Sequence, residues 1–388
     1  MKTASLLASL TSSIALASAA RLPVLPPGGL NVNGTPPVYH PLSDFDFQSF
    51  NLALNQEWIE LDLFRFGRER FSDEDFHNAG LTDDDINLIG FMAQQEVAHG
   101  QLFTNMIGPD RAAKPCKYQY PFDNVRDFFE FSQRVTRFGE AGTLGFLEHL
   151  NSRDGAQMIL QTITTESRQQ MAFRQLEGLH PMPVDFQTGI TQSMHWTLLA
   201  PYITECPAEN PRIEWMNFPG LNITNAPNAT EFFDPSNNTS TNDTSSSSGN
   251  STSSGNNTTL DTTPAITHDR SEPLTSPGRE ILLSWELPGK TVGYNNSYTT
   301  NTTAGPGKFV AWISQLNTTY TPLTDVNGTT GKTVQPDLGT TFGLNNTSTV
   351  VNSTMFVLIT DANVTVTPAN MTMLDPHVVA GPAIYTVG

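Results

Sequence analysis

Within its N-terminal half the chain reads Ala93-Gln94-Gln95-Glu96-Val97-Ala98-His99. The surrounding apolar residues recur three or four apart, which predicts an amphipathic helix. Glu96 and His99 fall on the same face as Met92 and Phe103, where further apolar residues would be expected. Residues three apart on one helix face present oxygen and nitrogen ligands together, so this spacing is typical of metal sites in helix bundles. On an exposed helix the same spacing is usually only solvated, and the interpretation therefore needs support from other helices.

Other segments repeat the pattern of a carboxylate within an apolar row. Helical periodicity extends from about 44 to 179, and interruptions near 72–82, 107–122 and 151–154 divide it into four predicted helices. Glu57 lies on the apolar face of the first helix and Glu166 on that of the fourth. Glu140 is the candidate on the third helix, where the apolar row is less regular. Thr82 and Asp85 predict a capped start for the second helix.

Counting from the loops places these carboxylates in pairs. Antiparallel helices joined by a short loop bring residues equidistant from that loop to similar levels. Glu57 and Glu96 lie about twenty residues on either side of position 77, and Glu140 and Glu166 about thirteen on either side of 153. Each hairpin should therefore bring its two carboxylates to one level. Counting leaves open whether the two hairpins share that level.

Converging carboxylates in an apolar core require compensation, because each uncompensated charge costs several kcal/mol. Two metal ions would be the simplest compensation. A second possibility stays open, in which Arg168 enters the core and neutralises a glutamate as a buried ion pair.

The first residues predict secretion. Lys2, the apolar stretch Leu6 to Leu16 and the small residues Ala17-Ser18-Ala19 have the pattern of a cleaved signal peptide. No later run reaches the roughly 20 apolar residues that span a bilayer. We expect no membrane partner, and a secreted protein that is released or held in the cell wall.

Net charge and cysteine content indicate which partners are disfavoured and whether a disulfide is expected. A formal charge of −18 disfavours binding to nucleic acid, whose phosphates are recognised by basic clusters. Cys116 and Cys206 are the two cysteines, and in an oxidising compartment they suggest one disulfide. Two buried free thiols are the alternative.

The chain is predicted to be an α+β multidomain protein. The ranges are a signal peptide (1–19), an extended proline-rich lead-in (20–43), an antiparallel four-helix bundle with a possible fifth helix near 186–203 (44–206), a linker rich in Ser, Thr and Asn (207–276) and a β-sandwich-like domain (277–388). About eighteen Asn-x-Ser/Thr sequons are present, and apart from Asn33 all lie at or after Asn222. We therefore expect the linker and the β-domain to carry glycans, while the helical region does not.

The chain resembles the ferritin-like superfamily, and most closely the fungal secreted ferritin-like proteins described as stress-response or late sexual development proteins. Desiccation-related plant proteins are more distant kin. The resembling segments are Leu54 to Glu60, Ala93 to His99, Phe138 to Gly142, Thr165 to Gln169, Cys206-Pro207 and Val379 to Pro382.

The resemblance implies a site for iron or manganese. By analogy with di-iron members, Glu57 and Glu140 would be terminal ligands, Glu96 and Glu166 bridging ligands, and His99 a nitrogen ligand. The second Glu-x-x-His is missing, because Gln169 stands where the histidine would be. Its neutral amide would weaken one metal position, so a site with one metal or none stays open.

Three functions are compatible with the sequence. The first is a metal-binding redox protein that protects cells during stress or sexual development. The second is a non-catalytic extracellular protein whose β-domain binds cell-wall polysaccharide or matrix partners, which exposed aromatics near Trp285, Tyr294, Tyr298, Trp312 or Tyr320 would support. Iron storage in a large cage is less favoured, because a glycosylated domain on every subunit would crowd a closed shell. No oligomeric state follows from the sequence.

Overall fold

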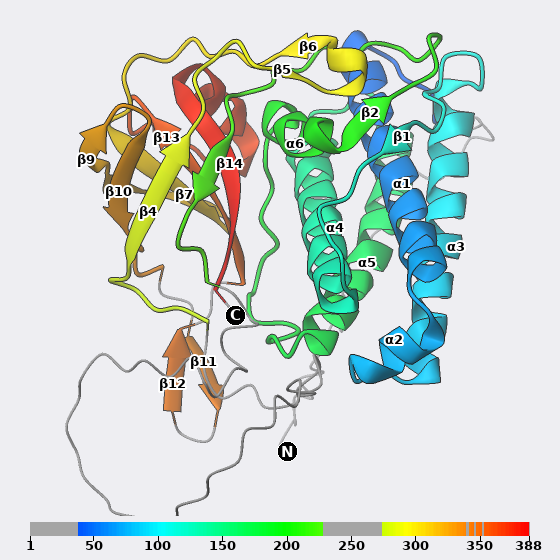
Figure 1. Cartoon of the computed structure of the whole chain (residues 1–388). Coiled ribbons are helices and arrows are strands. Elements are labelled where there is room, and N and C mark those ends of the chain that lie inside the picture. The colour runs from blue at the N-terminus through cyan, green and yellow to red at the C-terminus, as the bar shows by residue number, and fades with distance from the viewer. Residues whose placement is uncertain (1–37, 228–273, 339–340, 345–346, 351–352, 388) are drawn as a thin grey trace, which may run out of the picture. The chain divides into compact units, whose positions relative to one another are not determined.

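The four predicted helices are present in the computed structural model (Figure 1). They are α1 (Asp44–Arg70), α3 (Asp83–Ile107), α4 (Val125–Leu147) and α5 (Arg153–Leu176). The structure describes residues 38–227 and 274–387, except 339–340, 345–346 and 351–352. The expected signal peptide, nearly all of the lead-in and most of the expected linker lie outside these residues.

Side-chain caps explain where the helices begin. The side chains of Ser43, Thr82, Asn124 and Ser152 accept hydrogen bonds from backbone N–H groups in the first turns of α1, α3, α4 and α5. Thr82 and Asp85 form the predicted capping box. A short helix, α2 (Asp73–Asn78), occupies the connection between α1 and α3.

The connection between α3 and α4 follows the length of the bundle along α1 (Figure 1). Trp58 Nε1 donates to the carbonyl of Ala113 at 2.9 Å, and Tyr120 Oη donates to Asp62 Oδ1 at 2.6 Å. The crossover makes each helix antiparallel to both of its neighbours, which is the arrangement that lets all four present one face to a shared core.

The predicted disulfide joins this crossover to the end of the helical region. Cys116 and Cys206 are bonded, with their Cα atoms 4.3 Å apart. Beside them β1 (Lys117–Tyr118) pairs antiparallel with β2 (Ile203–Glu205). The predicted fifth helix is shorter than the apolar segment: α6 spans Gln192–Leu199, and a 3-10 helix at Ala200–Tyr202 contains Pro201.

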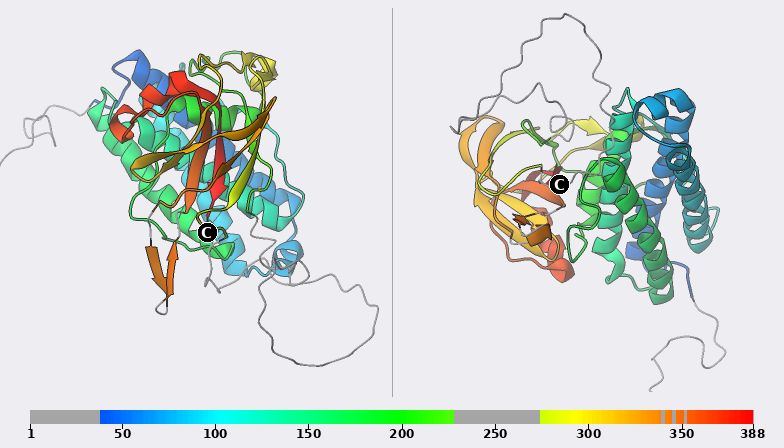
Figure 2. Two further views of the ribbon diagram at one scale, coloured as in Figure 1. Left: turned by 90° about the vertical axis from the view of Figure 1, so that its left-hand side faces the viewer. Right: turned by 90° about the horizontal axis from the view of Figure 1, so that it is seen from below.

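The C-terminal region is built from two four-stranded antiparallel sheets (Figures 1 and 2). The first has the order β3 (Leu221–Ile223), β4 (Glu280–Trp285), β10 (Thr330–Val334), β9 (Thr324–Asn327). The second has the order β14 (Val378–Thr386), β13 (Thr354–Thr360), β7 (Phe309–Ser314), β8 (Asn317–Pro322). The remaining strands form two hairpins, β5 (Thr291–Val292) with β6 (Tyr298–Thr299) and β11 (Thr341–Leu344) with β12 (Thr347–Val350).

One apolar core joins the two sheets, as the predicted sandwich requires. Ile281 and Leu283 from β4 pack in one cluster with Trp312 from β7 and Val357 from β13. The segment 207–227, which the sequence placed in the linker, supplies β3 to this sandwich and pairs Leu221 with Trp285. The domain boundaries at 206 and 277 stay a prediction.

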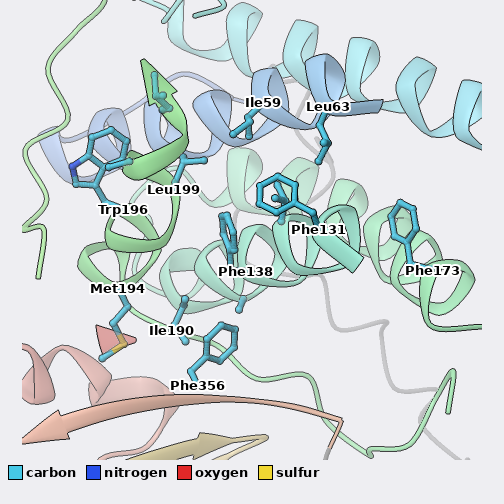
Figure 3. Packing of buried hydrophobic residues seen from close by; sticks show 14 of the residues in the cluster. Ile59, Leu63, Phe131, Phe138, Phe173, Ile190, Met194, Trp196, Leu199 and Phe356 are labelled. Carbon is cyan, nitrogen blue, oxygen red and sulfur yellow. The ribbon is translucent and has the colours of Figure 1, made fainter. Parts of the chain in front are cut away.

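The described residues from Tyr39 onward form one compact unit, in which helices and sheets share contacts. Phe356 of β13 belongs to the same buried cluster as Ile190 and Met194, and Figure 3 shows the three side chains close together. Thr191 Oγ1 donates to Asp375 Oδ1 at 2.8 Å, and the Gln315 backbone N–H donates to Thr188 Oγ1 at 2.6 Å. The segment around α6 therefore connects the bundle to the second sheet.

Two further features bear on the sequence-based hypotheses. No helix in the part of the chain that the structure describes has the length and apolar character needed to cross a bilayer. The aromatics considered for polysaccharide binding are buried or half-buried: Trp285, Tyr294, Tyr298, Trp312 and Tyr320. They form no exposed stacking platform, so polysaccharide binding stays a prediction.

Candidate metal centre

Three helices bring four predicted ligands together at one level of the bundle. Glu57 comes from α1, Glu96 and His99 from α3, and Glu166 from α5. One ligand atom from each of these residues lies within 4.8 Å of the others. We call these residues the four-residue site. Their convergence answers what counting left open, because Glu166 of the second hairpin meets the pair from the first.

His99 lies at the centre of the four-residue site. Its Nδ1 is 3.1 Å from Glu96 Oε2, 3.2 Å from Glu57 Oε2 and 3.7 Å from Glu166 Oε1. All four side chains are buried, and the exposed fraction rises only from 0% for Glu96 to 8% for His99. The imidazole therefore faces three carboxylates in a space from which bulk water is excluded.

The electrostatics of the four-residue site show the cost of this convergence. Burial raises the pKa of Glu57 well above its ordinary value, and the charge of Glu96 together with a hydrogen bond to that carboxyl adds to the rise. Burial likewise raises the pKa of Glu166, followed by repulsion from Glu57. Burial alone would lower the pKa of His99, but its hydrogen bond and ion pair with Glu96, together with the charges of Glu166 and Glu60, outweigh that effect and raise it. Without a cation the site retains protons that a divalent metal would displace.

Glu140 does not join the four-residue site. It is fully buried on α4, where Oε2 accepts from Arg137 Nη1 at 2.7 Å and Oε1 accepts from Ser167 Oγ at 2.5 Å. Arg137 in turn donates to the Thr188 carbonyl at 3.0 Å. The buried ion pair that the sequence analysis considered therefore exists, but Arg137 provides the cation. Arg168 is exposed and donates to the Thr164 carbonyl, so the possibility that it enters the core is excluded.

Gln169 lies beside the four-residue site, as its position in the fourth helix predicted. Its Nε2 donates to Glu96 Oε1 at 2.5 Å and to Gln95 Oε1 at 3.0 Å. Its own Oε1 is buried and has no hydrogen-bond partner. A buried carbonyl oxygen without a donor is costly, and a cation would satisfy it.

Glu60 is a further buried carboxylate on α1 that is absent from the predicted ligand set. It is 0% exposed, and burial followed by the charge of Glu96 raises its pKa. The signal was present in the spacing Glu57-Trp58-Ile59-Glu60, which puts both carboxylates on adjoining parts of one helix face. Other carboxylate and imidazole groups of the bundle lie outside its core: Glu130 is half-buried in an ion pair with Arg134, and Glu148 and His149 are exposed.

The residues present fit a divalent transition metal. Carboxylate oxygens suit Mn(II) and imidazole suits iron, and the mixed set accommodates either. Two buried oxygens without hydrogen bonds of ordinary geometry, Glu60 Oε2 on α1 and Gln169 Oε1 on α5, are further donor atoms on the helices that supply the four-residue site. The set lacks the second imidazole and the α4 carboxylate of a symmetric dinuclear site, so the donors are unequally distributed.

The fold and the site together define a ferritin-like protein: four antiparallel helices around a carboxylate and histidine core. Comparison of sequences supports this class, because the model of the ferritin-like domain matches residues 45–179. These residues contain all four members of the four-residue site.

Comparison also reaches beyond the bundle. The chain is 46% identical over 365 residues to Protein rds1 of Schizosaccharomyces pombe, an alignment covering 94% of this chain and 86% of that protein. The protein therefore belongs to the fungal ferritin-like family that includes Protein rds1, and the likeness includes the sheet region as well as the helices.

Proposed function

We propose that the bundle binds iron or manganese through Glu57, Glu96, His99 and Glu166, and that the bound metal serves a redox or protective role outside the cell. The observation that carries the proposal is the convergence of four buried ligand atoms within 4.8 Å. Buried carboxylates at this separation repel one another unless a proton or a cation compensates them. A metal ion compensates all three at once and also uses the imidazole.

Glu140 is left out of the proposed ligand set. Its carboxylate already has a counter-ion in Arg137 and a hydroxyl donor in Ser167. Recruiting it would leave the buried guanidinium without its carboxylate, at a cost of several kcal/mol. The ligands therefore come from α1, α3 and α5.

The redox part of the proposal rests on the class of metal. Iron or manganese held by carboxylates and imidazole would supply one-electron chemistry toward oxygen or peroxide. The protein's own residues would hold the ion and keep bulk water from it. The signal-peptide pattern and the sequons at and after Asn222 support a secreted glycoprotein, and the family resemblance supports action during stress or sexual development.

Metal content of purified variants tests the proposal. We expect elemental mass spectrometry to find iron or manganese in the wild-type protein purified without chelators. Glu96→Gln and His99→Ala should lose at least about tenfold in affinity for Fe(II) or Mn(II), because each removes a ligand from a buried site.

Exposed positions just after the end of α4 supply the matched controls. Glu148→Gln and His149→Ala remove the same chemical groups from exposed positions. They should leave the metal content unchanged. If the wild-type protein contains no metal and binds none on anaerobic addition of Fe(II), the metal-binding proposal is wrong. The hypothesis of a non-catalytic extracellular protein would then be favoured.

A further inference from the structure

The donor set is incomplete on the side of α4, and the structure offers a replacement on α1. Glu60 lies one helical turn beyond Glu57 and is 0% exposed. Residues three apart on a helix project from adjoining parts of one face, so Glu60 lies beside Glu57 on the buried face of α1.

A hydrogen bond of ordinary geometry holds one oxygen of Glu60 but not the other. Oε1 accepts from Gln56 Nε2 at 2.7 Å, and Gln56 Oε1 accepts from His195 Nε2 at 2.9 Å. Oε2 is buried and makes no hydrogen bond of ordinary geometry, although the Thr136 hydroxyl is close enough to lower the Glu60 pKa. An ionised carboxylate in a core is unfavourable when one of its oxygens has no strong donor, unless that oxygen binds a cation.

The helix opposite is shaped around this chain of hydrogen bonds. A Cβ atom at Gly139 would lie 2.5 Å from Gln56 Nε2, and one at Gly142 would lie 2.1 Å from His195 Nδ1. Burial lowers the pKa of His195 to about 3, so its ring is neutral and Nε2 carries the proton donated to Gln56. The glycines of α4 thus give space to the groups that hold Glu60, while Glu140 of the same helix is bound by Arg137.

We propose that Glu60, and not Glu140, supplies the fourth carboxylate of the metal centre. This inference rests on the proposed function. It gives the centre the ligands Glu57, Glu60, Glu96, His99 and Glu166, drawn from three helices. The remaining helix, α4, contributes no ligand. Its glycines give space to Gln56 and His195, and its Glu140 is paired with Arg137.

Two isosteric variants, Glu60→Gln and Glu140→Gln, separate the alternatives. Mn(II) titration followed by electron paramagnetic resonance counts free and bound ion without any activity assay. We expect Glu60→Gln to weaken Mn(II) binding at least about tenfold and Glu140→Gln to change it less than about threefold. The reverse order, or equal effects of the two variants, would overturn the inference.

Stability of the metal-free proteins gives a second readout. Glu60→Gln removes a buried carboxylate that repels its neighbours, and should raise the melting temperature at pH 8. Glu140→Gln leaves Arg137 buried without its carboxylate and should lower it. A fall for both variants would contradict the role assigned to Glu60.

Two safeguards keep the outcomes distinct. If Glu140→Gln does not fold, the double variant Arg137→Met with Glu140→Gln removes both buried charges and replaces it in the titration. Wild-type protein that binds neither Mn(II) nor Fe(II) would overturn the proposed function and this inference together. Wild-type binding with indifferent variants would overturn this inference alone.

Discussion

Glu177, at the C-terminal end of α5, shows how a single buried carboxyl sets a pH dependence away from the four-residue site. It is 3% exposed, and its Oε2 has no hydrogen-bond partner. Burial, followed by the charge of Glu130, raises its pKa to about 8 against the attraction of nearby arginines. Because the folded-state pKa exceeds the unfolded-state value, its contribution to stability is greatest below pH 4.5 and is lost as the pH rises toward 8.

Replacing this carboxyl by an amide should remove its pH dependence. We expect Glu177→Gln to gain stability relative to wild type between pH 5 and pH 9, by on the order of a few kcal/mol. Thermal unfolding of the metal-free proteins at both pH values measures the difference. Glu148→Gln, an exposed position only just beyond α4, should show no such change. A Glu177→Gln difference that is flat with pH would contradict a buried, protonated Glu177.

Sequence spacing predicted which residues lie close together, while their role as metal ligands stays a prediction. Glu96 and His99 were found from Glu-x-x-His, and Glu57 and Glu166 from their apolar rows. Glu140 also stood on an inward face, but the spacing Arg137-x-x-Glu140 already pointed to an ion pair that was overlooked. Side-chain direction cannot be read from a row alone, and so Arg168 was considered as the cation of a buried ion pair while Arg137 was not.

Among the helices, α4 meets its neighbours by close backbone approach. A Cβ atom at Gly145 would lie 1.7 Å from the carbonyl oxygen of Ile190, and Ile190 N donates to the Ala141 carbonyl at 3.0 Å. Backbone atoms cannot rotate away as a side chain can. The contact between α4 and the segment before α6 therefore depends on a residue without a side chain.

Gly145→Ala should consequently separate these segments. We expect it to lower the free energy of unfolding by about 2 kcal/mol or more, as overpacking does. Gly90→Ala is the matched control, because Gly90 is exposed within α3 and its Cβ would have nothing within 4 Å. That control should stabilise by about 0.5–1 kcal/mol through helix propensity. Chemical denaturation measures both free energies of unfolding. If Gly145→Ala leaves the free energy of unfolding unchanged, α4 and the segment before α6 are not in the close contact described.

Periodicity was sufficient for the long elements and insufficient for short ones. The four helices follow runs long enough to show a helical period, and the strands β4, β7, β13 and β14 follow short apolar runs. β3 has only three residues, and its partner β4 begins more than fifty positions later, so no local pattern indicated the pairing. The level shared by the two hairpins likewise depends on packing between helices, which loop counting does not contain.

At the scale of the whole molecule, helices and sheets are stabilised by one continuous core. Phe356 of β13 is 0% exposed and lies in the cluster that includes Phe138 of α4 and Trp196 of α6. Arg137, the partner of Glu140, has its guanidinium 6.0 Å from the centre of the Phe356 ring. The sheet region therefore contacts Arg137, whose ion pair with Glu140 keeps this carboxylate from the proposed metal centre.

Removing this aromatic side chain should affect both regions together. We expect Phe356→Ala to lower the free energy of unfolding by about 3–5 kcal/mol. Circular dichroism should still show the helix and sheet signals disappearing in one transition. Met373→Ala removes a side chain that is 54% exposed and should change stability by less than about 0.5 kcal/mol. Two separate transitions in wild type would contradict a shared core.

Anomalous X-ray scattering from crystals grown with Mn(II) tests the central claim most directly. The account predicts an anomalous peak among the carboxylates of Glu57, Glu96 and Glu166 and the imidazole of His99, with Glu60 oriented toward it. A bundle core without such a peak, or manganese bound only at carboxylates outside the bundle, such as Asp361 beside His377, would contradict it.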